Sequence, residues 1–281
     1  MVPDKKKEIR DRMKGLFWGL VVGDCLGSPI QFTTKDGHAT ITDMVPCKTF
    51  HTPAGHWTDD SSLAFCIADS YVRLERYDLR DIAMNFVRWY KEGFWSSMPY
   101  AFDIGGATET AIDAISRTGQ LKNGEEASQG NGSLMRLAPS FLMNYGAGDN
   151  ALVHEISDLT HNSTVVRAIV DQMVQVLTEH IEGHRTVLRS KYTARESVNN
   201  SGWVVSTFHA ALWALEQSTG FEQGMLLAVN LGGDADTIGA VYGQIAGALY
   251  GYEAIPERWL GAIKDRDRID LLIEQVLSLV W

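Results

Sequence analysis

The sequence predicts an all-α protein that forms a single compact domain of many helices. Apolar residues recur at spacings of three and four along most of the 281 residues, which is the periodicity of amphipathic helices. Runs that alternate between apolar and polar residues, as half-buried strands do, are scarce. No stretch has the composition of an interdomain linker, so we expect one domain over residues 1–281.

The apolar periodicity divides the chain into a series of expected helices. Their approximate ranges are 7–24, 58–76, 78–92, 105–117, 131–142, 150–158, 163–182, 201–217, 220–229, 236–250, 257–263 and 267–279. Two polar stretches, 118–130 and 183–200, are expected to be long loops. Residues 45–50 form the one segment that we expect to be a short extended piece.

Composition and charge limit the classes of function. Hydrophobic residues make up 45% and charged residues 21%, as in ordinary folded proteins, and the net charge is -10. An acidic chain is a poor general nucleic-acid binder, because phosphate contacts need an excess of Lys and Arg. The apolar run 16–22 is too short for a membrane span and lacks a cleavage pattern, so we expect neither a signal peptide nor a membrane partner. Three cysteines without a CxxC pair indicate reduced thiols in a cytoplasmic protein.

Glycines recur every four residues in two of the expected helices. They are Gly15, Gly19, Gly23 and Gly27 in the first helix, and Gly239, Gly243 and Gly247 in the helix near residue 240. Glycine inside a helix costs about 0.5–1 kcal/mol relative to alanine, so several in register need a compensating reason. A face without side chains lets another backbone approach closely. We therefore expect both helices in the middle of the bundle, where they could lie against each other; scattered spacers are the alternative.

Two acidic clusters each open an apolar helical run. The first is Thr58-Asp59-Asp60, and the second is Asp234-Ala235-Asp236-Thr237, which follows Gly232-Gly233. Carboxylates and threonine hydroxyls are hard oxygen donors of the kind that Mg2+ or Mn2+ prefers. If the fold joins the clusters, they form a binuclear metal site suited to hydrolysis. The alternative is that each cluster only caps its helix and complements the helix dipole.

Three further segments carry candidate functional residues. A glycine-rich turn with Gly130, Asn131, Gly132 and Ser133 leads into an apolar run, where exposed N–H groups could hold phosphate. Asp103 precedes a glycine pair at an expected helix start, where it could also be a cap. Asp24 lies among apolar residues at the end of the first helix, so its burial would demand a partner; it either supports the metals or caps a helix.

Together these segments resemble the ADP-ribosylglycohydrolase family. The resemblance runs through GLFWGLVVGDCLGSPIQF, HWTDDSSLAF, FDIGGATETAI, GNGSLMRLAPSFL, LTHNST, SGWVVSTFHAALWAL and VNLGGDADTIGAVYGQIAGALYG. The combination of TDD with GGDADTIGA is the most specific part. The resemblance implies an all-α domain, monomeric by analogy with the family, with two Mg2+ or Mn2+ ions at the base of a cleft.

The resemblance also implies roles for individual residues. The metal ligands would be Thr58, Asp59, Asp60, Asp234, Asp236 and Thr237, with Asp60 and Asp236 also taking part in catalysis. Gly130 to Ser133 would hold the diphosphate, His161 would line the ADP-ribose cleft, and Asp103 would lie near the scissile bond of an ADP-ribosyl-arginine. Gln31 departs from the pattern, because many members have a glutamate there as acid or base for serine-linked ADP-ribose.

We therefore expect a metal-dependent hydrolase that releases ADP-ribose from modified protein side chains, with arginine as the acceptor residue. The substitution at Gln31 argues against serine-linked substrates, since glutamine does not transfer protons near neutral pH. Two alternatives are a binding module that holds ADP-ribose without efficient hydrolysis, and an immunity protein that counters an ADP-ribosyltransferase toxin.

Overall fold

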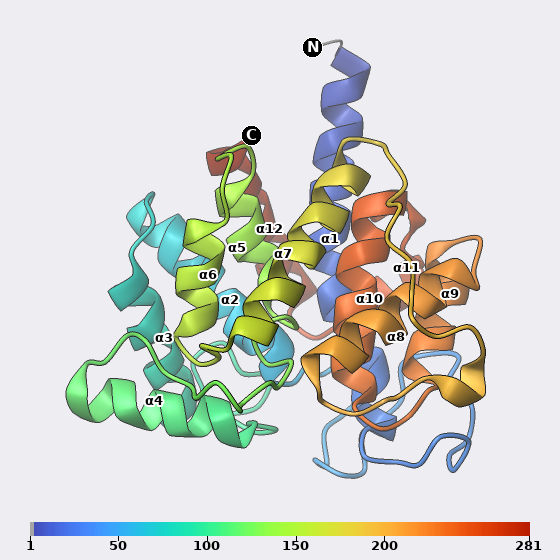
Figure 1. Cartoon of the computed structure of the whole chain (residues 1–281), viewed down its shortest axis with the longest axis horizontal. Helices are drawn as coiled ribbons and strands as arrows, with labels where there is room; N and C mark the ends of the chain where they lie inside the picture. Colours follow the sequence, from blue (N-terminus) through green and yellow to red (C-terminus); the bar gives the residue numbers. More distant parts are fainter. Residues whose placement is uncertain (1–2) are drawn as a thin grey trace.

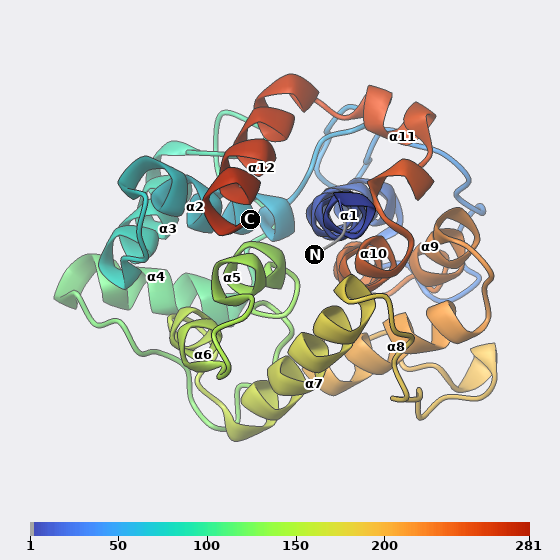
Figure 2. The same ribbon diagram turned by 90° about the horizontal axis from the view of Figure 1, so that it is seen from above.

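Two antiparallel helices, α1 (Pro3–Gly27) and α10 (Ala235–Tyr250), form the centre of the fold. In this computed structural model, which describes residues 3–281, α1 runs down the middle of the molecule with α10 directly beside it (Figures 1 and 2). Phe17 and Trp18 of α1 and Tyr242 of α10 are completely buried. Both helices are hence surrounded by other elements, as the glycine pattern predicts.

The glycines of these two helices face one another. A Cβ atom added to Gly19 would lie 2.0 Å from the carbonyl oxygen of Gly243, and one added to Gly243 would lie 1.9 Å from that of Gly19. Gly23 and Gly239 meet in the same way. The two backbones touch along this line, and side chains on either helix would push them apart. The prediction of a close helix–helix contact is confirmed.

The other helices surround this pair. Their bounds are α2 (Asp59–Leu74), α3 (Leu79–Glu92), α4 (Gly106–Thr118), α5 (Leu137–Asn144), α6 (Ala151–Asp158), α7 (Thr164–Ile181), α8 (Val204–Glu216), α9 (Phe221–Val229), α11 (Glu257–Ala262) and α12 (Arg266–Val280). Short 3-10 turns occupy Ser28–Ile30, Arg195–Ser197 and Tyr252–Ala254. Figure 2 shows α2 to α6 and α12 on one side of α1, and α8, α9 and α11 on the other. Their apolar side chains form one continuous core, and the all-α prediction is confirmed.

Two expected elements differ from the structure. The helix expected from residue 131 begins at Leu137, because residues 131–136 form turns that bond to other segments. Residues 45–50 are not an extended piece: the chain turns back after Cys47, and an isolated bridge joins Cys47 to Thr52. Both errors arise because the conformation of these segments depends on hydrogen bonds to distant residues or on irregular turns. The spacing of apolar residues carries no information about either.

Two smaller expectations concern cysteines and membranes. Cys25, Cys47 and Cys66 are free and buried, and burial raises the pKa of the Cys25 and Cys66 thiols well above the ordinary value. These two thiols are therefore inert core residues, as expected. Among the helices of residues 3–281, none combines the length and the apolar character that a membrane span requires.

Candidate active site

The central helix pair brings distant acidic segments to one end of the molecule. Because α1 and α10 are antiparallel, Asp24 near the end of α1 lies close to the start of α10. Asp24 also reaches the start of α2, where its carboxylate accepts hydrogen bonds from the N–H groups of Thr58 and Ser61, both at 3.0 Å, and from their hydroxyls at 2.9 and 2.6 Å. A residue of α1 thus caps α2 across the core.

This arrangement tests the capping interpretation of the acidic clusters. The side chain of Thr58 makes no capping hydrogen bond to α2, and that of Asp234 makes none to α10. Side-chain capping by Thr58 and by Asp234 is therefore wrong, and Asp24 caps α2 instead, whereas the acids still lie where they complement the helix dipoles. Gly232 and Gly233 have φ values of +66° and +64°, a conformation that suits glycine. They turn the chain so that Asp234 enters the cleft, as expected.

The clustered carboxylates are buried and repel one another. Asp60 and Asp236 are almost fully buried, and Asp59 is 5% exposed. Burial, together with the charges of neighbouring aspartates, raises the pKa of all three carboxyls well above the ordinary value. Burial also raises the pKa of Asp24 to about 6. The starts of α2 and α10 point at the cluster and offset part of this repulsion through their dipoles.

Several oxygen atoms of the cluster have no partner. Oδ2 of Asp60, Asp103 and Asp236 is buried without a hydrogen bond among the described residues. The Thr237 hydroxyl approaches Asp60 Oδ1 at 3.5 Å, a long contact. A buried carboxylate oxygen without a partner is costly, and a hard divalent cation would satisfy such atoms.

The carboxylate and threonine oxygens of the two clusters therefore fit Mg2+ or Mn2+ by their chemistry, and some of them lack a hydrogen-bond partner. They do not form a complete coordination sphere in this structure. Within residues 3–281, no group of three or more His, Cys, Asp or Glu side chains is already arranged to hold a metal ion. Threonine hydroxyls, which complete the expected set, are not part of such groups.

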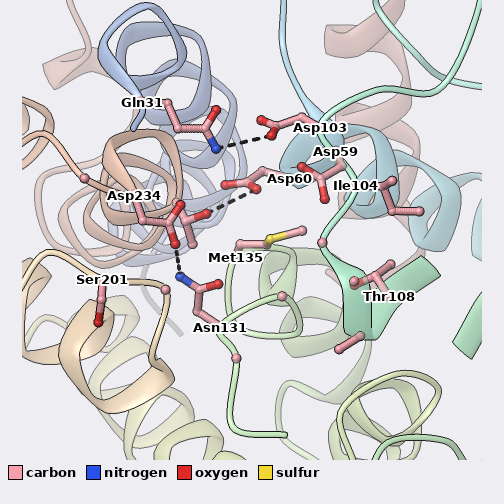
Figure 3. A pocket seen from close by; sticks show the side chains of 18 of the residues that line it. Gln31, Asp59, Asp60, Asp103, Ile104, Thr108, Asn131, Met135, Ser201 and Asp234 are labelled. Atoms are coloured by element: carbon pink, nitrogen blue, oxygen red, sulfur yellow. Dashed lines mark hydrogen bonds between the residues drawn. The ribbon is translucent and has the colours of Figure 1, made fainter. Parts of the chain in front are cut away.

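Asp103 and Gln31 face each other above the acidic cluster. Gln31 Nε2 donates a hydrogen bond of 3.3 Å to Asp103 Oδ1, and both side chains point into the pocket in Figure 3. Asp103 is not a helix cap, because α4 begins after Gly105 and Asp103 makes no bond to its start. Burial raises the pKa of Asp103 to about 7. This carboxyl group exchanges a proton near neutral pH, whereas Gln31 only orients it.

The glycine-rich loop 130–133 forms the opposite wall of the pocket. The N–H group of Asn131 donates to Gly202 O at 3.0 Å, and its carbonyl accepts from Leu134 and Met135. Gly132 and Ser133 donate no backbone hydrogen bond within the described part of the chain. The prediction that a helix start supplies these groups is wrong, but the N–H group of Gly132 in the cleft wall remains available for an anion.

Asn131 connects this loop to the acidic cluster. Its Nδ2 atom lies 2.5 Å from Asp234 Oδ2 and 2.8 Å from the hydroxyl oxygen of Thr207 (Figure 3). The amide group thus fixes the orientation of Asp234. The sequence does not predict this role, because it identifies Asn131 only as part of a loop that could bind phosphate.

His161 lies buried beneath the same loop. A Cβ atom on Gly132 would lie 2.7 Å from its Cε1 atom, so glycine is required there for close packing. Arg136 donates hydrogen bonds to Gly132 O and to the Thr160 hydroxyl oxygen, and that hydroxyl lies 2.7 Å from His161 Nδ1. Burial and the Arg136 charge lower the pKa of His161 to about 3, so the ring is neutral.

These contacts favour one of the two neutral tautomers of His161. A guanidinium group only donates, so the Thr160 oxygen accepts from Arg136, and its own proton is free to be donated to His161 Nδ1. In that arrangement the ring proton lies on Nε2, which faces the glycine loop. The result is an N–H donor beneath the loop that keeps its proton over the physiological pH range.

Most of the expected site residues line one cleft of about 730 Å³. Those in its wall are Gln31, Asp59, Asp60, Asp103, Gly130, Asn131, Gly132, His161, Asp234 and Thr237. Three expected residues, Thr58, Asp236 and Ser133, lie buried behind the wall. The cleft volume suits a nucleotide-sized ligand.

The cleft also contains residues that sequence reasoning missed. They are Phe32, Ile104, Thr108, Met135, Asn200, Ser201 and Gly202. Ser201 and Gly202 follow the loop 183–200, to which the sequence assigns no role, and Asn200 O accepts from Asp234 N–H at 2.9 Å. The position of this segment depends on long-range hydrogen bonds, so no local pattern identifies it.

A model of one protein family matches almost the whole chain. It is the model described as ADP-ribosylglycohydrolase, and it covers residues 5–281. The chain is 33% identical to the ADP-ribosylarginine hydrolase Tri1 of Serratia proteamaculans, over 98% of this chain and 81% of that protein. It is 34% identical to the protein of the same name from Pseudomonas putida, over 95% and 78%. The ADP-ribosyl-[dinitrogen reductase] glycohydrolase of Rhodospirillum rubrum is 28% identical, over 95% and 93%.

A solved structure agrees with these relatives. It is that of an "ADP-ribosylglycohydrolase-related protein complex", and it superposes with a TM-score of 0.84. Its sequence is 33% identical, and the match covers 98% of this chain and all of that chain. The shared fold extends through every element that contributes to the cleft.

Proposed function

Because the chain belongs to the ADP-ribosylglycohydrolase family and is an ADP-ribosyl hydrolase, we propose that it cleaves the N-glycosidic bond between ADP-ribose and an arginine side chain of a modified protein. The observation that carries this proposal is the position of Asp103, paired with Gln31 rather than with a second acid. Relatives at 33% and 34% identity are named as hydrolases of ADP-ribosylarginine. The products would be ADP-ribose and the unmodified protein.

The acidic cluster is proposed to hold two Mg2+ or Mn2+ ions. The residues are Thr58, Asp59, Asp60, Asp234, Asp236 and Thr237, and the unpartnered oxygens of Asp60 and Asp236 support the assignment. When bound, such a pair supplies Lewis-acid polarisation of water and of sugar hydroxyl groups. Asn131 and Asp24 orient the surrounding donors, since each bonds to a residue of this set.

The remaining side chains are proposed to position the substrate and move its proton. The free N–H group of Gly132, with the Nε2–H of His161, would hold the diphosphate and provide binding energy remote from the reacting bond. Asp103 would accept a proton from the attacking water and return it to the departing guanidine nitrogen, because its carboxyl exchanges protons near neutral pH. Gln31 would donate to Asp103 and keep it pointed at the cleft.

Release of ADP-ribose from an arginine-modified protein tests the proposal. We expect release in Mg2+ or Mn2+, none in EDTA, and none from a serine-linked substrate under any of these conditions. Asp60→Asn and Asp236→Asn should each abolish release while the protein stays folded. Full activity of either variant would contradict the metal assignment, and bound but uncleaved ADP-ribose would favour a binding module. Monomeric state and cytoplasmic location stay predictions.

A further inference from the structure

Four aromatic side chains form a continuous patch beside the cleft, and one of them, Phe32, lies in the cleft wall. We call Phe32, Phe50, Phe102 and Tyr100 the aromatic rim. Ring centroids are 6.3 Å apart for Phe32 and Phe50, 5.3 Å for Phe50 and Phe102, and 6.4 Å for Phe102 and Tyr100. The rings come from two segments, residues 32–50 and 100–102, which flank the cleft from different parts of the chain.

Two rings of the rim are exposed, and the other two, Phe50 and Phe102, are partly buried. Phe32 is 67% exposed and Tyr100 is 53% exposed. A cluster of apolar rings left open to water is unfavourable unless a partner covers it.

The backbone conformation of Phe32 is also energetically unfavourable. Its φ is +64°, a region that is uncommon for bulky residues and suits glycine or asparagine. The conformation is held by the Phe32 N–H group, which donates to Gly233 O at 2.7 Å, and by Gly233 N–H, which donates to Thr33 O at 2.8 Å. Strain that the surroundings enforce is concentrated at functional sites. A large ring at this position thus calls for a reason beyond folding.

The rim adjoins the side of the pocket where the scissile bond is assigned. Phe32 directly follows Gln31 and Phe102 directly precedes Asp103, and these two polar residues are hydrogen-bonded to each other. Figure 3 places Gln31 and Asp103 on one side of the pocket and Asn131 of the glycine loop on the other. A ligand whose diphosphate contacts the glycine loop would direct its C1 atom and the attached residue toward the rim.

We infer that the aromatic rim receives the modified arginine side chain and the adjoining basic residues of the substrate protein, an inference that rests on the proposed function. A substituted guanidinium is planar and cationic, and aromatic faces bind such groups well. The chain's net charge of -10 attracts a basic partner at long range. The rim thereby selects arginine-bearing segments, while the glycine loop holds the nucleotide part that all ADP-ribosylated substrates share.

Two variants of Phe32 distinguish the effect of its aromatic face from the effect of its apolar volume. Phe32→Leu keeps a Cβ atom and apolar volume but removes the aromatic face, whereas Phe32→Tyr keeps the face. Tyr100→Leu tests the other end of the rim. Trp281→Leu is the control, because Trp281 is an exposed aromatic residue at the chain end, which Figure 1 shows away from the start of α10. Each variant is made in an Asp60→Asn background, so that binding is measured without turnover.

The affinity of an arginine-ADP-ribosylated peptide is then compared with that of free ADP-ribose. Phe32→Leu and Tyr100→Leu should each weaken peptide binding by roughly three- to ten-fold, the range of a cation–π contact, and leave ADP-ribose affinity unchanged. Phe32→Tyr and Trp281→Leu should bind both ligands as the background protein does. Unchanged melting curves confirm that the variants are folded.

Two results would overturn the inference. Equal weakening of peptide and ADP-ribose would place the adenine ring, rather than arginine, on the rim. No weakening in the Phe32→Leu/Tyr100→Leu double variant would remove the rim from recognition altogether. Turnover by the wild-type enzyme is measured separately: if arginine-linked ADP-ribose is bound in a rim-dependent way but never released, the proposed function fails and the rim assignment stands.

Discussion

Asn131 Nδ2 lies 2.5 Å from Asp234 Oδ2, so the glycine loop and the acidic cluster share one hydrogen bond. Asp234 is partly buried. Burial raises the pKa of its carboxyl group, and the hydrogen bond from Asn131 is the largest of the contacts that lower it again. If the loop holds the nucleotide and the cluster holds the cations, as we propose, this pair would link the two binding events.

Removal of the Asn131 amide should weaken cation binding. Loss of a hydrogen bond behind a metal ligand typically lowers metal affinity about 10- to 100-fold, and we expect a value in this range for Mn2+ binding to Asn131→Ala by calorimetry. Asn150→Ala is a suitable control, because Asn150 donates to exposed Asp171 outside the cleft. Equal Mn2+ affinities of the two variants would show that Asn131 does not orient Asp234.

The contact between α1 and α10 should tolerate no side chain. Gly243→Ala places a Cβ atom 1.9 Å from Gly19 O, and overpacking of this kind costs about 3 kcal/mol or more when backbone must move. Gly261→Ala, in α11, meets nothing within 4 Å and should stabilise the protein by roughly 0.5–1 kcal/mol. Urea unfolding of both variants gives the comparison, and a stable Gly243→Ala would refute the contact.

Without divalent cations the protein should lose stability as pH rises. The pKa values of Asp24 and Asp103 are raised to about 6 and about 7 by burial, so the folded protein binds protons that the unfolded chain has released. The free energy of unfolding then falls from about pH 4 to pH 7. Cations that replace those protons should raise the melting temperature more at pH 8 than at pH 5.

Thermal melts with EDTA and with Mg2+ across this range measure the effect. The difference between the two curves cancels the contributions of histidines with lowered pKa, such as His161. Asp60→Asn has one carboxylate fewer and should show a smaller increase. A cation effect that is constant with pH would mean that the cluster does not bind the ions.

The proton of His161 should lie on Nε2 at all pH values above about 4. Nitrogen NMR of the imidazole ring distinguishes the two neutral tautomers directly. In Thr160→Val the hydroxyl that donates to Nδ1 is absent, so both tautomers should become populated. Thr164→Val is the control, because its hydroxyl bonds to Glu126 instead. A wild-type ring protonated on Nδ1 would exclude the Arg136–Thr160–His161 chain of donors.

Glutamate at position 31 should impair hydrolysis of the arginine linkage at neutral pH. The Gln31 amide donates to Asp103, and Gln31→Glu replaces this donor with a second acid, which raises the pKa of Asp103 further. We expect the rising limb of the pH–rate profile to move to higher pH, with ADP-ribose affinity nearly unchanged. An unmoved profile would show that Gln31 does not influence Asp103.

The sequence predicts the parts of this molecule that depend on local pattern. Glycines such as Gly19 and Gly243 reveal the central contact because their spacing follows the helical repeat. Asp59 and Asp234 stand out because both open apolar helices. What the sequence misses depends on distant partners: Asp24 caps a helix that begins far along the chain, and Lys35 Nζ donates to Val198 O at 2.6 Å to place the loop beside the cleft.

The close α1–α10 contact has a consequence for how this chain tolerates changes in length. One residue inserted between Gly19 and Asp24 would rotate the Asp24 carboxylate by ~100° around α1 and withdraw it from Thr58. The same holds between Asp236 and Gly243 on α10, because the glycines lock each helix in one register. Insertions and deletions should therefore be confined to the loops. The number of residues between the glycines and the aspartates of each helix determines where the carboxylates lie in the cleft.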